Sequence, residues 1–508
     1  MDSSKNRKAW PGLKRWVGRH LSLVVAVVIV GSLIGMFSTF WVGAGHLVWR
    51  FLRYSWPVLL LLVTAGALAA KADSNSYHIG HRGKPTGLIV AAVVAALVMV
   101  PTIVFASQSA LWSASNATVV ADAEVLSFDA RAPYMVAASA SDRFLGDTTG
   151  DSIGTLTFLQ AEQRYTTLVV RRGFVQGYES IQTMSLPLIG TATTQDVSFC
   201  QFSEQAGRRI GGGWFTNSLT MAVLMRTSAS TMFAEEDVFA VCDDGTPKVY
   251  VPLTRLKGVF APIKVPAGVA VYDGSTGQLE IVGSMQDARL PVYPLSLARA
   301  QRESSKAGHG LWDWVFGKAG WENTNVDTGD PNGGNRAEFS LGTTSGGVYV
   351  TPLTPRGSSS SIVALSTIGQ DATTKDKLTP ITIHAFPAGQ SRLANSTVAH
   401  TITTTTLSGY KAAGLQVFEI VPGEDGKWIA SIGSEQTILY RALIGLDGSV
   451  VLTGSSDPAD PGAGTTPAGH VTLDKPISQM TADELLVLGQ ELGQLVQDTL
   501  QRLHDLGG

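Results

Sequence analysis

The sequence predicts a membrane-anchored fold in which three transmembrane helices precede a large antiparallel α+β ectodomain, rich in β-strands, and a C-terminal amphipathic helix. The first observation is composition. Of 508 residues, 44% are hydrophobic and 16% are charged, and the mean hydropathy is +0.15; roughly 25% of residues are charged in an average soluble domain. The second is a set of long uncharged runs within residues 1–106, and the third is the recurrence of short β-branched runs after them.

The expected membrane spans cover residues 21–42, 55–70 and 87–106. The first, LSLVVAVVIVGSLIGMFSTFWV, has no charged residue and would measure about 33 Å as a helix, enough to cross a bilayer core. The second run is shorter and extends an amphipathic stretch, and the third contains Pro101, which a membrane helix tolerates. A buried soluble helix is the alternative for these runs, and two spans in place of three stay open. A cleaved signal peptide is a further alternative for the first run, although the apolar region of a signal peptide is shorter.

The charge distribution predicts an orientation. Residues 1–106 carry 11 Lys and Arg against two acids, concentrated in the tail 1–20 and the loop 71–86. Because basic loops stay inside, we expect a multi-pass protein of the cell membrane with a cytoplasmic N-terminus and an extracytoplasmic C-terminal domain. Residues 107–508 carry 27 bases and 39 acids, which argues against a nucleic-acid partner. The expected partners are the lipid bilayer and other envelope proteins or a second copy of the chain.

Short strands dominate the prediction after residue 106. The runs include TLTFL (155–159), YTTLVV (165–170), DVFAVC (237–242), KVYVPLT (248–254), GVAVYDG (268–274), QLEIVG (278–283), GVYVTPL (347–353), SIVALSTI (361–368), PITIHAF, LQVFEIV, KWIASIG and GSVVLTG. Asp and Gly in Asp273–Gly277 are typical of a hairpin turn. Helices are expected over Ser218–Phe233 and Pro294–Lys306. Together these elements indicate an antiparallel α+β class.

Composition also predicts the boundaries. A basic tail (1–20) and the three spans (21–106) precede a first α+β region (107–322), a loop (323–337) and a second β-rich region (338–453). A flexible linker (454–470), poor in large apolar residues, leads to the amphipathic helix (471–508). VYVPLT (249–254) returns as VYVTPLT (348–354); a duplicated unit and a chance match are both open.

One stretch carries a family resemblance. The segment Lys248–Val282 contains Val271, Asp273, Thr276 and Gly277 in the order V-Y-D-G-S-T-G. It resembles small extracytoplasmic domains of the PepSY type, in which a hairpin with a V-D-x-x-T-G strand packs on a helix. More broadly, the region 250–301 is similar to poorly characterised bacterial membrane proteins. The resemblance implies a binding or regulatory role and brings no catalytic mechanism.

The two cysteines, Cys200 and Cys242, are in neither a CxxC nor a metal-ligand spacing. An exported chain with one pair commonly closes one disulfide, and a loop of ~40 residues would give about 3–4 kcal/mol of stabilisation. The sequence therefore predicts a Cys200–Cys242 bond. Two buried thiols that never meet are the alternative.

The sequence predicts no catalytic, cofactor-binding or metal site. It has no P-loop, HExxH or strand-linked GxGxxG motif. The string GDSIG at 150–154 follows a polar turn rather than the buried strand that a nucleophile elbow requires. Asp327, Asp330, Asn332 and Asn335 are expected in a solvated loop, with a Ca²⁺ site as the alternative. Glu235, Glu236 and Asp237 are expected in a solvated turn, with a general acid/base pair as the alternative.

Two apolar groups are candidate interaction sites. Trp312, Trp314 and Trp321 in WDWVFGKAGW suit docking on a membrane surface or holding a glycan, and packing into a small core is the alternative. Leu488, Leu492 and Leu495 form a stripe at helical spacing, which we expect to dock on the ectodomain or on a neighbouring copy.

The function that follows is a non-enzymatic, membrane-anchored envelope protein whose extracytoplasmic domain binds a partner or contributes to an assembly. No cofactor is expected. An envelope hydrolase with unidentified residues and a subunit of a transport or secretion complex stay open as alternatives.

Overall fold

The computed structural model describes residues 116–454 with internal gaps, together with positions 26, 27 and 30. The gaps are 122–125, 146–151, 174–175, 214–216, 229, 258–262, 306–315, 317–319, 324–338, 345, 357–360, 388, 404–414, 425–426 and 446–447. Every structural statement below refers to the described residues.

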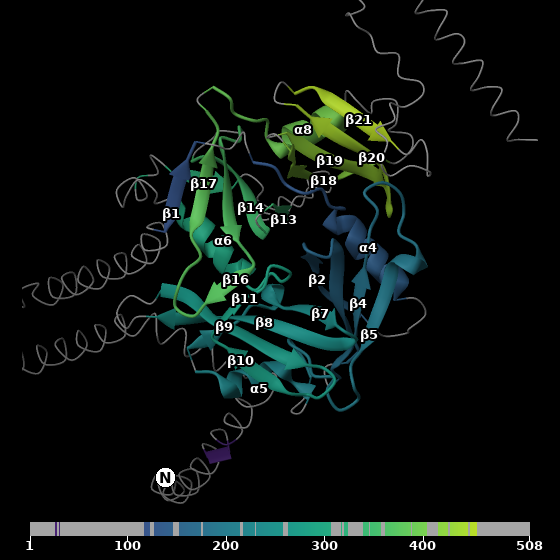
Figure 1. Ribbon diagram of the computed structural model, residues 1–508, viewed down its shortest axis with the longest axis vertical. Helices are drawn as coiled ribbons and strands as arrows, with labels where there is room; N and C mark the ends of the chain where they lie inside the picture. The colour runs from purple at the N-terminus through teal and green to yellow at the C-terminus, as the bar shows by residue number, and fades with distance from the viewer. Residues whose placement is uncertain are drawn as a thin grey trace, which may run out of the picture.

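Four β-sheets stand in a ring, in the manner of a four-bladed propeller (Figure 1). We call these sheets blades 1 to 4 in chain order. Blade 1 contains β2 (Ser152–Leu159), β3 (Arg164–Val170), β4 (Tyr178–Met184) and β5 (Val197–Gln201). Blade 2 contains β6 (Thr231–Met232), β7 (Phe239–Asp243), β8 (Thr246–Lys257), β9 (Ile263–Asp273) and β10 (Leu279–Val282).

Blades 3 and 4 complete the ring. Blade 3 contains β12 (Trp321–Asn323), β13 (Phe339–Thr343), β14 (Gly346–Pro355), β15 (Ala364–Gly369) and β17 (Ile381–Ala385), and β1 (Ala117–Val120) joins β17 in parallel. Blade 4 contains β18 (Gln416–Pro422), β19 (Trp428–Ser434), β20 (Thr437–Ile444) and β21 (Val450–Gly454). A small sheet of β11 (Ser284–Gln286) and β16 (Ala372–Thr374) connects blades 2 and 3.

A helix precedes each blade in the chain. The four helices are α4 (Tyr134–Phe144), α5 (Leu219–Arg226), α6 (Leu295–Ser304) and α8 (Asn395–Thr401). The strands then follow one another outward, so that β2, β7, β13 and β18 lie nearest the middle of the ring in Figure 1. Among the described residues, a helix followed by a mainly antiparallel sheet therefore occurs four times, with the parallel strand β1 as the exception in blade 3.

Blades 2 and 3 share one register in their inner strands. In blade 2, Phe239 pairs with Tyr250 across β7 and β8; in blade 3, Phe339 pairs with Val350 across β13 and β14. The short strands β6 and β12 pair with the far ends of β8 and β14. This register aligns PLT (252–254) with PLT (352–354). The two VYV triplets, at 249–251 and 348–350, are then one residue out of alignment.

Apolar cores lie between neighbouring blades. Leu168 and Ile181 of blade 1 pack with Val251 of blade 2, and Leu365 of blade 3 packs with Ile432 of blade 4. Phe418 and Ile438 of blade 4 pack with Tyr165 and Met184 of blade 1. A further core packs Tyr293 and Leu297, at α6, on Tyr349 and Ile368 of blade 3. Burial of each large apolar side chain contributes about 1.5–3 kcal/mol, so these interfaces hold the ring closed.

The fold class expected from the sequence is wrong. Between residues 116 and 454, the described chain is a β-rich ring of four sheets with four helices of 11 residues or fewer, rather than the expected α+β arrangement. In the part of the chain that the structure describes, no helix has the length and apolar character needed to cross a membrane. This finding also corrects the expected multi-pass localisation. Apart from positions 26, 27 and 30, the segments 21–42, 55–70 and 87–106 lie outside the described residues.

Candidate functional site

Residues 126–133 precede α4 and pass beside the inner strand of blade 3. The backbone N–H of Asp129 donates to the oxygen of Gly342 on β13 at 3.0 Å. The Gln160 amide, at the end of β2, donates to the Asp129 carboxylate at 3.2 Å. A side chain at Gly342 would collide with Gln160 and Asp129. The absence of a Cβ at this position therefore lets blade 1 reach the segment.

Arg131 in this segment contacts three of the four blades. Its Nη1 and Nη2 each lie 2.8 Å from a carboxylate oxygen of Glu419 on β18. The same guanidinium donates to the backbone oxygen of Ser340 on β13 and to the hydroxyl of Tyr165 on β3. The Arg131 and Glu419 side chains are only 1% and 5% exposed. One cation thus joins blades 1, 3 and 4.

The electrostatics of this group favour a fixed ion pair. Burial by itself lowers the pKa of Arg131, but the Glu419 carboxylate, with Tyr165 and Tyr134, raises it well above its usual range. Burial likewise raises the pKa of Tyr165, whose hydroxyl donates to the backbone oxygen of Ala132. Every nitrogen of the guanidinium has an acceptor, so this group serves to connect the blades.

A second polar group lies between blade 2 and α6. The Asp237 carboxylate accepts hydrogen bonds from the Ser296 N–H at 2.7 Å and from the Ser296 hydroxyl at 2.6 Å. Lys264 on β9 donates to the same hydroxyl at 3.4 Å, and Glu236 pairs with Arg299 on α6. Asp237 is buried, so the expectation that it lies in a solvated turn is wrong.

Ser296 lies between the Asp237 carboxylate and the Lys264 ammonium group, an arrangement also found around activated serine nucleophiles. The same contacts are those of a helix cap, however. Pro294 occupies the N-cap of α6 and provides no side-chain cap, while Asp237 satisfies one of the free N–H groups of the first turn. Burial raises the pKa of Asp237 although the hydrogen bonds from Ser296 lower it. We therefore assign Asp237 to holding α6 on blade 2.

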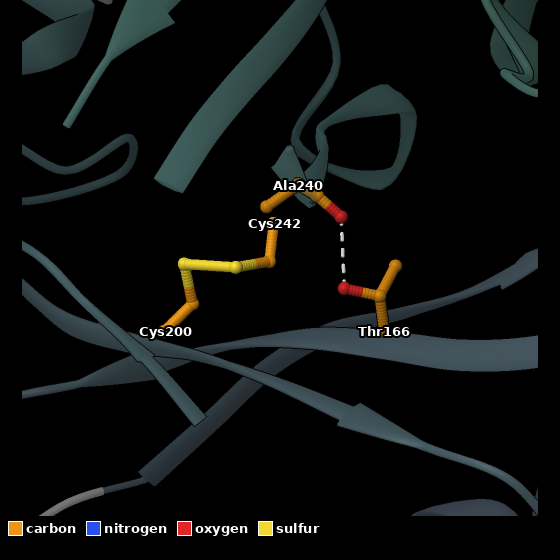
Figure 2. Close-up of a disulfide and its surroundings, with 4 residues drawn as sticks. All are labelled: Thr166, Cys200, Ala240 and Cys242. Atoms are coloured by element: carbon orange, nitrogen blue, oxygen red, sulfur yellow. Dashed lines mark hydrogen bonds between the residues drawn. A yellow bond between two sulfur atoms is a disulfide. The ribbon is translucent and has the colours of Figure 1, made fainter. Parts of the chain in front are cut away.

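The expected disulfide between Cys200 and Cys242 is present. It joins β5 of blade 1 to β7 of blade 2, with Cα atoms 6.0 Å apart. Figure 2 shows beside it the Thr166 hydroxyl on β3, which donates to the backbone oxygen of Ala240 at 2.8 Å. Two strands of blade 1 are thus tied to the inner strand of blade 2.

Of the predicted aromatic cluster, only Trp321 is among the described residues. It belongs to β12, is half-buried, and packs against the small core of Leu353, Ala364 and Ile383. Trp312 and Trp314 lie outside the described part of the chain, as do Leu488, Leu492 and Leu495. Docking by these residues stays a prediction.

Three charged residues of the structure, Arg131, Glu419 and Arg441, were not predicted as site residues. A usable signal existed for the last two, since each is a lone charge in an apolar strand, VFEIV and LYRALI respectively. Arg131 lies in a short connection, DARAPY, where no periodicity marks it.

The described residues contain no cluster of three or more His, Cys, Asp or Glu side chains arranged to hold a metal ion. Comparison of the chain with protein families, with curated proteins and with solved structures found no match. The resemblance of Lys248–Val282 to PepSY-type domains therefore stays a prediction, and the function has to be argued from the geometry alone.

Proposed function

We propose that this chain is a non-enzymatic binding protein whose ring of blades offers its outermost strands to a protein partner. The observation that carries the proposal is the same on three blades. Val119 on β1 is 53% exposed, Phe199 on β5 is 46% exposed and Val451 on β21 is 60% exposed. Each of these strands is the outermost of its sheet and pairs with one neighbour only among the described strands.

An outermost strand offers unpaired backbone N–H and C=O groups to another chain. A single exposed apolar side chain is ordinary on a protein surface, but an apolar side chain on an open strand edge combines two features that strand-addition partners use. The polar groups between the inner strands, by contrast, bond to one another around Arg131. The outer strands are thus the better candidates for binding.

Site-specific photo-crosslinking in cells that express the full chain tests the proposal. A photo-reactive amino acid at position 119, 199 or 451 should give discrete adducts with a protein partner. Position 162, exposed in the turn between β2 and β3, is the matched control and should give none. A chain that stays folded and yields no adduct from any of the three outer strands would contradict the proposed function.

A further inference from the structure

Blade 4 carries a row of polar side chains across its three outer strands. Arg441 on β20 lies directly opposite Ser431 on β19 and Thr453 on β21. Residues that are directly paired in neighbouring antiparallel strands project from the same face of a sheet. One guanidinium is therefore flanked by two hydroxyl groups on a single face.

The surroundings of this row are apolar. Two residues further along the same face, Leu443 on β20 pairs with Ile429 on β19 and with Val451 on β21. Ser431 is buried, Ile429, Leu443 and Arg441 are half-buried, and Val451 and Thr453 on the outermost strand are exposed. In Figure 1, β21 borders the outside of the ring. We call these six residues, Ile429, Ser431, Arg441, Leu443, Val451 and Thr453, the Arg441 face.

Arg441 lacks the partners that Arg131 has. Its Nε is buried and has no hydrogen-bond partner, and no ion pair joins its guanidinium to any described residue. Burial lowers the pKa of Arg441, and the charge of Glu424 raises it only in part. Removing a cation from water without pairing it is unfavourable, so the free chain carries a charge that a partner's anion would stabilise.

We infer that the Arg441 face binds an extended segment of a partner protein through a carboxylate side chain, Asp or Glu, set among apolar residues. The inference rests on the proposed function and specifies its chemistry. The planar guanidinium fits a carboxylate by two parallel hydrogen bonds, and the exposed hydroxyl of Thr453, directly paired with Arg441, can donate to the same group. The apolar neighbours suit valine- or leucine-type flanking residues, and a polyphosphate ligand would require several cations rather than one.

Fluorescence anisotropy with the full chain tests this inference. The probes are a labelled extended peptide, Thr-Val-Glu-Val-Thr, blocked at both ends, and its twin with Gln in place of Glu. The Glu peptide should bind at least tenfold more tightly than the Gln peptide. Arg441→Gln should abolish this difference, whereas Arg164→Gln, which removes an exposed arginine from β3, should preserve it. Equal binding of the two peptides, or no binding of either, overturns the inference.

Three further measurements distinguish a carboxylate site from an internal ion pair and from a general anion site. If Glu424 neutralised Arg441 in solution, Glu424→Gln would tighten binding of the Glu peptide; unchanged affinity supports an unpaired Arg441. Inorganic phosphate that displaced the Glu peptide at equal concentration would indicate a general anion site and overturn the carboxylate assignment. Arg441→Met should raise the melting temperature of the free chain because it removes an unpaired, half-buried charge, and a lower melting temperature would contradict the inference.

The outcome for this face can be distinguished from that of the proposed function. Crosslinking from positions 119 and 199 does not involve Arg441. Suppose that adducts form at those positions but Arg441→Gln leaves the binding of the Glu and Gln peptides unchanged. That result would overturn this inference and leave the proposed function supported. Loss of adducts at all three outer strands would remove both.

Discussion

Arg131 and Glu419 form a bidentate ion pair across 288 residues of sequence, with two nitrogen–oxygen distances of 2.8 Å. One partner precedes the first blade and the other belongs to the inner strand of the last. The contact therefore links the beginning of the ring to its end. Since the pair also bonds to blade 3 through Ser340, its integrity should matter for the closure of the whole ring.

We expect the loss of either partner of this ion pair to destabilise the folded chain. Glu419→Gln and Arg131→Met should each lower the free energy of unfolding by roughly 3–5 kcal/mol, because each disrupts a buried ion pair and leaves its partner uncompensated. The double variant Arg131→Met/Glu419→Gln should cost much less than the sum of the single changes. Urea unfolding of the four proteins measures these values. Additive losses would contradict the assignment of the two residues to one unit.

The disulfide gives a second prediction. Cys200→Ser/Cys242→Ser should lower the free energy of unfolding by about 3–4 kcal/mol, because the bond closes a loop of 42 residues that is otherwise free in the unfolded chain. Reduction of the unmutated protein should reproduce the loss. Thr166→Val, which removes only the neighbouring hydrogen bond to Ala240, should cost about 1 kcal/mol. A double serine variant as stable as the oxidised parent would contradict the prediction.

Local patterns in the sequence predicted most strands, because alternation is a property of neighbouring residues. The hairpin at Asp273 illustrates this: its carboxylate accepts from the N–H groups of Ser275 and Thr276, and Gly277 has a φ of +75°. Helix α6 lies within the predicted range, and α5 ends at Arg226, earlier than predicted, because β6 follows at residue 231.

The arrangement of these elements could not be predicted in the same way. Alternation is identical in an α+β sheet and in a propeller blade, so it does not report how many sheets form or that they close into a ring. Helix α4 was not predicted because its buried face is made of Val136, Ala137 and Ala140, which give a weak apolar signal. Asp237 was expected in solvent because three consecutive acids are usually exposed, whereas the short 3-10 turn directs the third toward Ser296.

A glycine on β9 gives a third prediction. Gly268 has a φ of +101°, and a Cβ there would lie 2.1 Å from the backbone oxygen of Val282. Gly268→Ala should therefore lower the free energy of unfolding by roughly 2–5 kcal/mol, from backbone strain and overpacking together. Gly283→Ala is the matched control, because nothing lies within 4 Å of its Cβ position, and it should be neutral or slightly stabilising. Similar effects of the two substitutions in chemical denaturation would contradict this account of blade 2.

The pH dependence of stability should report on Asp237. Burial raises the pKa of this carboxyl in the folded chain, even though Ser296 and Lys264 lower it. The folded state thus holds the proton more tightly than the unfolded state does. The resulting contribution to stability is fully present below the unfolded pKa, about 3.9, and is lost as pH rises through the folded value. Asp237→Asn should therefore gain stability relative to the parent as pH increases.

Chemical denaturation of the two proteins between pH 4 and pH 7 measures that relative gain. Titrations elsewhere in the chain affect both proteins equally, so they cancel in the difference between the two free energies of unfolding. The Asn side chain keeps an oxygen that can accept from the Ser296 N–H, so the cap on α6 survives while the titration disappears. Glu236→Gln is the control for charge alone, since the Glu236–Arg299 pair is about two-fifths exposed on both sides and such pairs contribute little. Two results would contradict the prediction: a difference in the free energy of unfolding that does not change with pH, or a parent that becomes more stable relative to Asp237→Asn as pH rises. Either would show that Asp237 acts as an ordinary anionic cap on α6.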